Sequence, residues 1–318
     1  MSTAFIFPGQ GSQTVGMGKA LADAFPSARA VFQEVDDALS QSLSTLMWDG
    51  PADELTLTAN AQPALMAVSL AAMRVLEAEA GLNLAQDAAF VAGHSLGEYS
   101  ALAAAGALTV SDAARLLRIR GNAMQNAVPV GAGAMAALLG LSYEDAVAVA
   151  AEAAGDDVCQ AANDNADGQV VVSGATKAVE RAIEIAKAKG AARAILLPVS
   201  APFHCRMMAP AADAMAEALA KASVKAPVVP VVSNVKAGPV TDPQEIIRLL
   251  VEQVTGTVRW RESVLFMASA GVTRTVEVGA GKVLSGLSRR ITKEIAASAV
   301  GTPDDVAAFI AARRAPAA

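Results

Sequence analysis

The sequence predicts an α/β protein made of a large domain with a largely parallel sheet and a small domain inserted into it. Two observations carry this prediction. In most of the chain, short apolar runs that predict strands alternate with helical stretches, as is typical of parallel sheets. These runs cover residues 4–7, 88–92, 228–233 and 273–278. Residues 134–199 instead follow the order β-α-β-β-α-β, which is the ferredoxin-like arrangement. We therefore expect a small domain at 128–200 and a large domain made of 1–127 and 201–318.

The first candidate site is the pentapeptide Gly-His-Ser-Leu-Gly at 93–97, between the apolar run 88–92 and a helical stretch at 99–108. A strand, Gly-x-Ser-x-Gly and a helix form the nucleophile elbow of α/β-hydrolase-like folds. Such a turn holds the serine at a helix N-terminus, where main-chain amides favour negative charge. The alternative is a glycine-rich turn in which Ser95 only caps the helix. The pentapeptide alone does not decide between the two.

Composition and charge exclude several classes of protein. Hydrophobic residues make up 53% of the 318 residues and charged residues 18%, which is typical of a compact globular protein. The net charge of −6 argues against broad binding to nucleic acid. The first residues lack the basic segment of a signal peptide, and the apolar run 99–111 is too short to span a bilayer. We expect a cytoplasmic protein without a membrane or nucleic-acid partner.

Metal chemistry is not indicated either. The two cysteines and two histidines show no ligand spacing, so we expect no metal and no cofactor. Residues 7–13 form a polar, glycine-rich loop directly after the first strand, where ligands bind in open α/β sheets. It is not a dinucleotide fingerprint, because Thr14 occupies the third glycine position. Gln10 can donate its side-chain amide into a crevice there, or the loop is a solvated turn.

A charged residue interrupts the apolar face of one predicted helix. We expect this helix to begin with Ser111 as its N-cap. Its apolar face carries Ala113, Leu116, Leu117 and Met124. Arg120 lies in the middle of that face, where an unpaired charge is costly. Its guanidinium either binds a substrate carboxylate or has a structural role. In the structural case it forms an ion pair within the protein, or its side chain reaches solvent from the edge of the apolar face.

His204 is the only plausible general base for Ser95. His94 is adjacent to the serine in the elbow, where successive side chains point in different directions. His204 lies in the segment 199–205, where the chain returns to the large domain, and a crevice between domains is a common ligand site. The alternative is a structural histidine. Cys205 is a rival nucleophile that no elbow presents, and we expect a small buried thiol.

Three further local predictions concern secondary structure. Gln62-Pro63 is expected to open a long helix that ends at Gly81, because proline suits the first helical turn and glycine the C-terminal cap. The turn-forming residues at 163–168 predict a polar loop. A last helix near 303–313 is expected to precede a mobile alanine-rich tail.

Five motifs in this order give the chain a family resemblance. They are Phe7-Pro8-Gly9-Gln10-Gly11-Ser12-Gln13, Gly93-His94-Ser95-Leu96-Gly97-Glu98-Tyr99, Arg120-Gly121-Asn122-Ala123-Met124-Gln125, Ser200-Ala201-Pro202-Phe203-His204 and Val258-Arg259-Trp260. The set resembles the malonyl-CoA:acyl-carrier-protein transacylases of bacterial fatty-acid synthesis and the related acyltransferase domains of polyketide synthases. The resemblance covers nearly the whole chain.

The resemblance implies a serine–histidine pair that transfers a malonyl group. Ser95 matches the nucleophile and His204 its base, and no carboxylate completes a triad. A main-chain carbonyl that matches Gln253 would orient the imidazole instead. Gln10 and the N–H of Leu96 match the oxyanion hole.

The resemblance also implies how the substrate is recognised. Arg120 matches the clamp on the malonyl carboxylate, and His94 and Phe203 are expected in the substrate site, with phenylalanine before the histidine as in the malonyl type. Ala280 replaces a proline that is common in the family, at a turn away from the chemistry. The implied partners are malonyl-CoA and acyl carrier protein, and we expect a monomer.

Two other functions stay open at this stage. A serine hydrolase of the esterase or thioesterase type fits the elbow equally well, but it predicts an Asp or Glu behind the histidine. A non-catalytic binding module would keep the fold without the chemistry. An acidic carrier would need basic residues, although ordinary solvated helix faces explain any single one of them. The candidate groups are Lys177, Arg181, Lys187, Lys189 and Arg193, and Arg289, Arg290 and Lys293.

Overall fold

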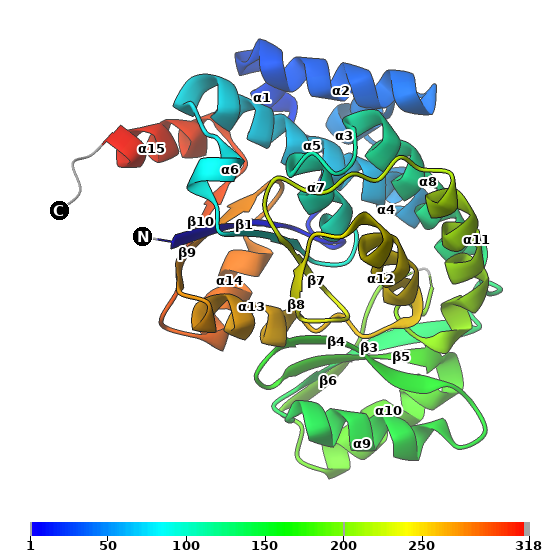
Figure 1. Ribbon diagram of the computed structural model, residues 1–318. Coiled ribbons are helices and arrows are strands. Elements are labelled where there is room, and N and C mark those ends of the chain that lie inside the picture. Colours follow the sequence, from blue (N-terminus) through cyan, green and yellow to red (C-terminus); the bar gives the residue numbers. More distant parts are fainter. Residues whose placement is uncertain (1, 200, 315–318) are drawn as a thin grey trace.

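The computed structural model describes residues 2–199 and 201–314 and contains two sheets (Figure 1). Ser200 of the fourth motif and the expected mobile tail at 315–318 lie outside the described residues. The larger sheet has the strand order β10-β9-β1-β2-β7-β8, in which only the β7–β8 pair is antiparallel. Its strands are β1 (Ser2–Phe7), β2 (Phe90–Gly93), β7 (Val231–Ser233), β8 (Gly238–Val240), β9 (Val272–Val278) and β10 (Ala296–Val300).

Helices cover both faces of this sheet, as parallel strands require. In Figure 1, α5, α7 and α8 lie on one face and α13 and α14 on the other. The N-terminal helices are α1 (Lys19–Ala24), α2 (Pro26–Leu39), α3 (Leu43–Asp49), α4 (Ala52–Thr56), α5 (Thr58–Ala80), α6 (Leu84–Asp87), α7 (Gly97–Ala104) and α8 (Val110–Asn126). The C-terminal ones are the 3₁₀ turn η1 (Arg206–Met208) and α11 (Ala209–Ala220), α12 (Pro243–Thr255), α13 (Trp260–Ser269), α14 (Val283–Ile291) and α15 (Pro303–Arg314).

The smaller sheet is antiparallel, with the strand order β4-β5-β3-β6. Its strands are β3 (Gly133–Leu139), β4 (Cys159–Ala166), β5 (Gln169–Ala175) and β6 (Arg193–Leu196), and its helices are α9 (Tyr143–Ala154) and α10 (Thr176–Ala188). The helices cover one face, and the other face is turned toward the large sheet (Figure 1). The predicted fold class, with its β-α-β-β-α-β insertion, is confirmed. The domain boundaries at 127/128 and 200/201 stay a prediction.

Two predicted helix starts are wrong. The side chain of Thr109, not of Ser111, caps α8 by accepting from the N–H of Asp112, while the Ser111 hydroxyl donates to Glu34. Two hydroxyl residues two positions apart are both suitable caps, and only packing against α2 selects between them. Helix α5 begins at Thr58, so Pro63 lies inside it rather than at its start.

The predicted loop at 163–168 is too long, because β4 continues through Ala166 and only residues 167–168 form a turn. Contacts with the large domain keep these residues in a strand, although their residue types favour a turn. Asp164 is fully buried and receives the Arg261 guanidinium at 3.0 Å, and its N–H donates to the Val258 carbonyl. Asn163 forms an isolated parallel bridge with Val258. The end of β4 is therefore attached directly to the start of α13.

Candidate active site

The elbow at 93–97 connects β2 to α7 in a turn that only glycines permit. A Cβ atom on Gly93 would lie 1.8 Å from the Gly97 carbonyl oxygen, and one on Gly97 would lie 2.3 Å from that of Phe7. Ser95 has φ of 53°, in the left-handed region that is unfavourable for a residue with a side chain. Such strain persists only where the surroundings hold it, and it is concentrated at functional sites.

Asn234, directly after β7, holds this strained turn. Its Oδ1 accepts the Ser95 N–H at 2.7 Å, and its Nδ2 donates to the Gly93 carbonyl at 2.7 Å. One buried amide therefore satisfies main-chain groups on both sides of His94. The left-handed conformation of Ser95 is stabilised from the neighbouring strand rather than from within the elbow.

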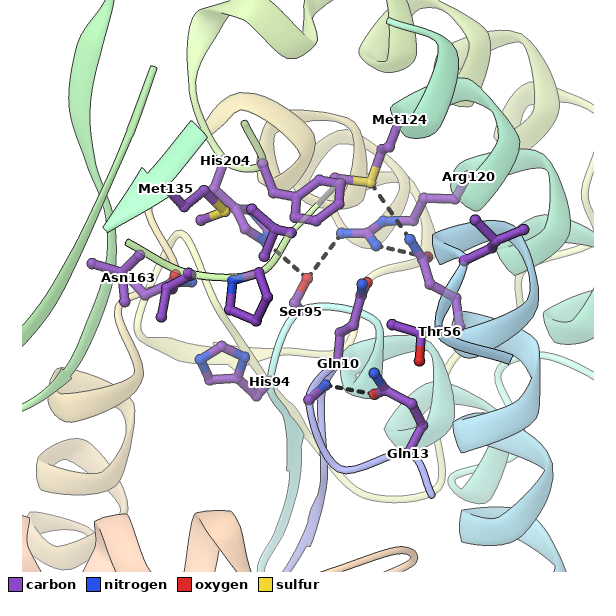
Figure 2. A pocket seen from close by; sticks show the side chains of 18 of the residues that line it. Gln10, Gln13, Thr56, His94, Ser95, Arg120, Met124, Met135, Asn163 and His204 are labelled. Atoms are coloured by element: carbon purple, nitrogen blue, oxygen red, sulfur yellow. Dashed lines mark hydrogen bonds between the residues drawn. The ribbon is translucent and has the colours of Figure 1, made fainter. Parts of the chain in front are cut away.

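The structure brings Ser95, His204 and Gln253 into one chain of hydrogen bonds, of which Figure 2 shows the bond between Ser95 and His204. Ser95 Oγ lies 2.8 Å from His204 Nε2, and His204 Nδ1 lies 2.9 Å from the Gln253 carbonyl oxygen. Since that oxygen can only accept, Nδ1 carries the proton and Nε2 is free to take one from the serine. Burial, together with the nearby Arg120 charge, lowers the pKa of His204 to about 3. The imidazole is therefore neutral at physiological pH, as a general base must be.

Arg120 reaches the same hydroxyl from α8. Its side chain is 1% exposed, as the helical period predicted, and Nη2 lies 3.1 Å from Ser95 Oγ. Nη1 donates to Gln62 Oε1 at 2.8 Å and Nη2 to Gln253 Oε1 at 2.9 Å. No carboxylate of the described residues pairs with it, and its buried Nε has no partner among them. A buried guanidinium with neutral partners is suited to a ligand carboxylate.

Gln10 and Leu96 flank the serine on the remaining sides. Gln10 lines the pocket beside Ser95 (Figure 2). Its Nε2 donates to Thr58 Oγ1 at 3.1 Å. Leu96 is the residue before α7, so its N–H lies at a helix N-terminus. No hydrogen bond within the described part of the chain uses that N–H. Their role as an oxyanion hole stays a prediction.

A pocket of about 750 Å³ opens onto this group. Its large-sheet side is mostly polar, with Gln10, Gln62, His94, Ser95, Arg120 and His204. The side formed by the smaller sheet and the segment that follows it is mostly apolar, with Met135, Val171, Leu197, Pro198 and Val199 beside Asn163 and Asn165. His94 Nε2 lies 2.8 Å from Asn165 Oδ1, and Phe203 also lines the pocket. Every predicted site residue except Leu96 and Gln253 therefore lines one cavity. Gln253 contacts His204 through its main chain and Arg120 through its side chain, and Leu96 directly follows Ser95.

Sequence reasoning missed three residues of this site. Asn234 accepts a hydrogen bond from the elbow at Ser95, and Glu98 accepts one from the Gln253 side chain. Gln62 accepts one from Arg120. Glu98 was visible as the residue after the elbow, in the first turn of its helix. The other two gave no signal, because their partners lie 139 and 58 positions away in the chain.

The basic residues proposed to receive a carrier are mostly engaged elsewhere. Arg181 pairs with Asp157, Lys187 with Glu184 and Lys189 with Glu152. These pairs are solvent-exposed, which is the ordinary state of helix surfaces. Among the described residues, no helix combines the length and the apolar character needed to cross a bilayer.

Comparison with known proteins defines the class. Residues 4–307 match the acyl transferase domain family, and the chain belongs to this family.

Within the family, the chain is similar to enzymes of one kind. It is 48% identical over 307 residues to the malonyl CoA-acyl carrier protein transacylase of Escherichia coli strain K12, covering 96% of this chain and 98% of the relative. The enzyme of the same name from Bacillus subtilis strain 168 is 47% identical, over 95% and 94% of the two chains. The resemblance drawn from the five motifs is confirmed.

The chain is also similar to solved structures of such enzymes. The acyl-carrier-protein-S-malonyltransferase of Bartonella henselae superposes with a TM-score of 0.96 at 57% identity, covering 99% of this chain and 100% of that one. A malonyl-transacylase in complex with a type II PKS acyl-carrier protein superposes with a TM-score of 0.95 at 41% identity, over 98% and 100% of the two chains.

Proposed function

We propose that the chain transfers the malonyl group of malonyl-CoA to the phosphopantetheine thiol of acyl carrier protein through an ester on Ser95. This reaction would feed fatty-acid or polyketide synthesis. One observation carries the proposal: a single hydroxyl lies 2.8 Å from the base His204 and 3.1 Å from the guanidinium of Arg120. A nucleophile, its base and a clamp for a carboxylate thus meet at one atom.

The first half-reaction loads the serine. His204 Nε2 takes the Ser95 proton while Oγ attacks the thioester carbonyl of malonyl-CoA. Gln10 and the Leu96 N–H stabilise the resulting oxyanion, and one such donor typically contributes about 3 kcal/mol. The carbon–sulfur bond then breaks, and the CoA thiolate leaves with the proton that His204 carries.

The second half-reaction reverses these roles. The phosphopantetheine thiol gives its proton to His204 and attacks the malonyl ester. The carbon–oxygen bond to Ser95 breaks, His204 returns the proton to Oγ, and malonyl-carrier leaves. The same residues act in both directions, which is the basis of a ping-pong mechanism.

Arg120 supplies the preference for an acidic acyl group. Its partners in the free protein are neutral oxygens of Ser95, Gln62 and Gln253, which are weaker acceptors than a carboxylate. A malonyl carboxylate offers the charged acceptor that these side chains lack. An acetyl group offers none, so it would leave the buried guanidinium without an ionic partner.

A serine hydrolase is the main competing function. Its usual triad places an Asp or Glu on Nδ1 of the histidine. Here the partner of His204 Nδ1 is the Gln253 main-chain oxygen, and the nearby carboxylate of Glu98 contacts the Gln253 amide instead. Incubation with malonyl-CoA separates the two functions. Rapid release of free malonate, unaffected by added acyl carrier protein, would favour the hydrolase.

Intact-mass spectrometry tests the proposal directly. Malonyl-CoA should add one malonyl group to the wild type, and holo acyl carrier protein should remove it. Ser95→Ala should carry no adduct. Ser100→Ala is a matched control, because Ser100 is also a buried serine of the same segment but does not line the pocket. A wild type without an adduct would contradict the enzyme proposal and favour a binding module.

Carrier docking and the oligomeric state remain predictions. We expect a monomer, which size-exclusion chromatography with light scattering checks. If the smaller sheet's helix α10 receives the carrier, charge reversal at Lys177 should raise the KM for carrier and leave malonyl loading unchanged. An unchanged KM would move the docking surface elsewhere, for example to the group around Arg290.

A further inference from the structure

Glu98 is a buried carboxylate that the proposed mechanism does not use. It lies in the first turn of α7, three residues after Ser95, and its side chain is 2% exposed. One of its oxygens, Oε2, accepts both the Asn234 N–H at 3.0 Å and Gln253 Nε2 at 2.8 Å. Burying an ionisable group is costly, so its position inside the active-site network calls for a reason.

Gln253 is the residue through which Glu98 reaches the chemistry. Its side-chain nitrogen faces acceptors only, with Glu98 Oε2 at 2.8 Å and the Ser95 carbonyl at 3.1 Å. Its side-chain oxygen faces the Arg120 guanidinium at 2.9 Å, which can only donate. A reversed amide would point its oxygen at a carboxylate and its N–H groups at a cation. Glu98 and Arg120 together therefore permit a single orientation of this amide.

The same residue also holds the base. The main-chain oxygen of Gln253 accepts from His204 Nδ1, so side chain and main chain of one residue serve the clamp and the base. We propose that Glu98 is a positioning residue that fixes the Gln253 amide and thereby places Arg120 and His204 around Ser95. The inference rests on the proposed function, because it assigns Glu98 a part in that reaction.

The alternative is that Glu98 only satisfies the Asn234 N–H and supports the fold. The two roles differ in what they do to acyl selectivity. A purely structural loss reduces the amount of active protein, so it lowers malonyl and acetyl loading by the same factor. A positioning loss disturbs Arg120 in particular, which acts on malonyl alone. The ratio of the two loading rates therefore separates the roles.

Glu98→Gln is the sharpest variant. Its single carboxamide oxygen can still accept both hydrogen bonds that now go to Oε2, so size and contacts are retained and the charge is removed. Hydrogen bonds to an ionised acceptor are about twice as strong as neutral ones, and a carboxamide no longer forces the Gln253 orientation. We expect the ratio of malonyl to acetyl kcat/KM for Ser95 loading to fall about tenfold, with a smaller loss for acetyl alone.

Glu277→Gln is the matched control. Glu277 is also fully buried, and it accepts the main-chain N–H groups of Leu284 and Ser285 at 3.0 and 2.7 Å at the start of α14, outside the pocket. It should lose stability without a change in the ratio. If Glu98→Gln behaves like this control, with an unchanged ratio, the positioning role is wrong. A wild type that never loads malonyl would instead refute the proposed function, and this inference with it.

The wild type alone provides a second test if the variant does not fold. Burial raises the pKa of Glu98 to about 7, against the opposing hydrogen bonds and the Arg120 charge. The titratable groups whose charges act on Glu98 are Arg120 on α8 and Tyr99 on α7, and His204 is the base of the same site. Burial lowers the pKa of His204 to about 3 and raises that of Tyr99 far above the neutral range, so neither titrates between pH 6 and 8.

Glu98 is thus the group of this cluster that changes charge in that interval. It is ionised above pH 7 and neutral below, so lowering the pH from 8 to 6 should reduce the malonyl-to-acetyl ratio severalfold. The same titration on Ser100→Ala should follow the wild type. A ratio that stays constant, or that rises as the pH falls, would overturn the inference.

Discussion

The two sides of the pocket are built by different rules. On the large-sheet side, polar groups are buried, linked to one another and carried by strained backbone at Ser95 and His204, both with positive φ. On the side of the smaller sheet, Met135 and Val171 are ordinary inward residues of paired strands. The polar side functions only if a few hydrogen-bonded residues keep one arrangement. The apolar side only has to fill space with side chains of suitable size. Substitutions on the two sides should therefore have very unequal effects.

The largest expected effect is at the elbow. Gly93→Ala places a Cβ 1.8 Å from the Gly97 carbonyl oxygen, which the turn cannot accommodate. We expect a loss of about 4 kcal/mol or more in the free energy of unfolding, measured by urea titration. Gly286→Ala in α14 is the counterpart, because nothing lies within 4 Å of its Cβ position. It should gain about 0.5–1 kcal/mol from helix propensity. If the two variants change the free energy of unfolding equally, the elbow is not a sterically constrained turn.

The next largest effect is on the base. His204→Ala should reduce the rate of Ser95 loading about 10³-fold, within the range of a lost general base. Rapid-quench intact-mass measurement checks this, and circular dichroism checks that the fold is retained. Cys205→Ala, at the adjacent buried position, should load at nearly the wild-type rate. Comparable losses in both would point to a structural role for the whole segment.

A smaller effect is expected at the clamp, and it should depend on the acyl group. Arg120→Ala should lower kcat/KM for malonyl loading about 100-fold, or about 2.7 kcal/mol, and lower acetyl loading far less. Arg120→Lys should be intermediate, since an ammonium retains the charge without the bidentate geometry. Competition between the two acyl-CoAs gives the ratio directly. If malonyl still outcompetes acetyl by the wild-type margin, the clamp assignment is wrong.

The smallest effect is expected on the apolar side. Leu197→Ala removes part of the pocket lining but no hydrogen bond of the network. We expect less than about a threefold change in malonyl loading, because Leu197 is only partly buried and its truncation removes little apolar contact area. Steady-state kinetics with malonyl-CoA and holo carrier measures it. A loss of malonyl loading as large as that of Arg120→Ala would show that the two sides of the pocket do not differ in this way.

The same contrast explains what the sequence could predict. Ser95 follows from a local motif and Arg120 from a helical period. His204 follows because it is the one histidine of the sequence outside the elbow. The Gln253 carbonyl came from the family resemblance alone, since any residue has a carbonyl. Asn234 was missed because its hydrogen bond to Ser95 spans 139 positions and has no local pattern. The strand at 163–166 was mistaken for a loop because Asp164 is held by Arg261, a contact that residue propensities do not encode.

The attachment of β4 to the start of α13 has a practical consequence for exchanging parts between related chains. The smaller sheet joins the rest through its two covalent connections and also through Asp164, Asn163 and their partners Arg261 and Val258. A chimera spliced only at the two connections would set a foreign insert against this chain's own Arg261 and Val258. Where that insert lacks a carboxylate at the position of Asp164, Arg261 would lose its ionic partner. Chimeras should therefore transplant residues 257–261 along with the insert, because the unit of exchange is discontinuous in sequence.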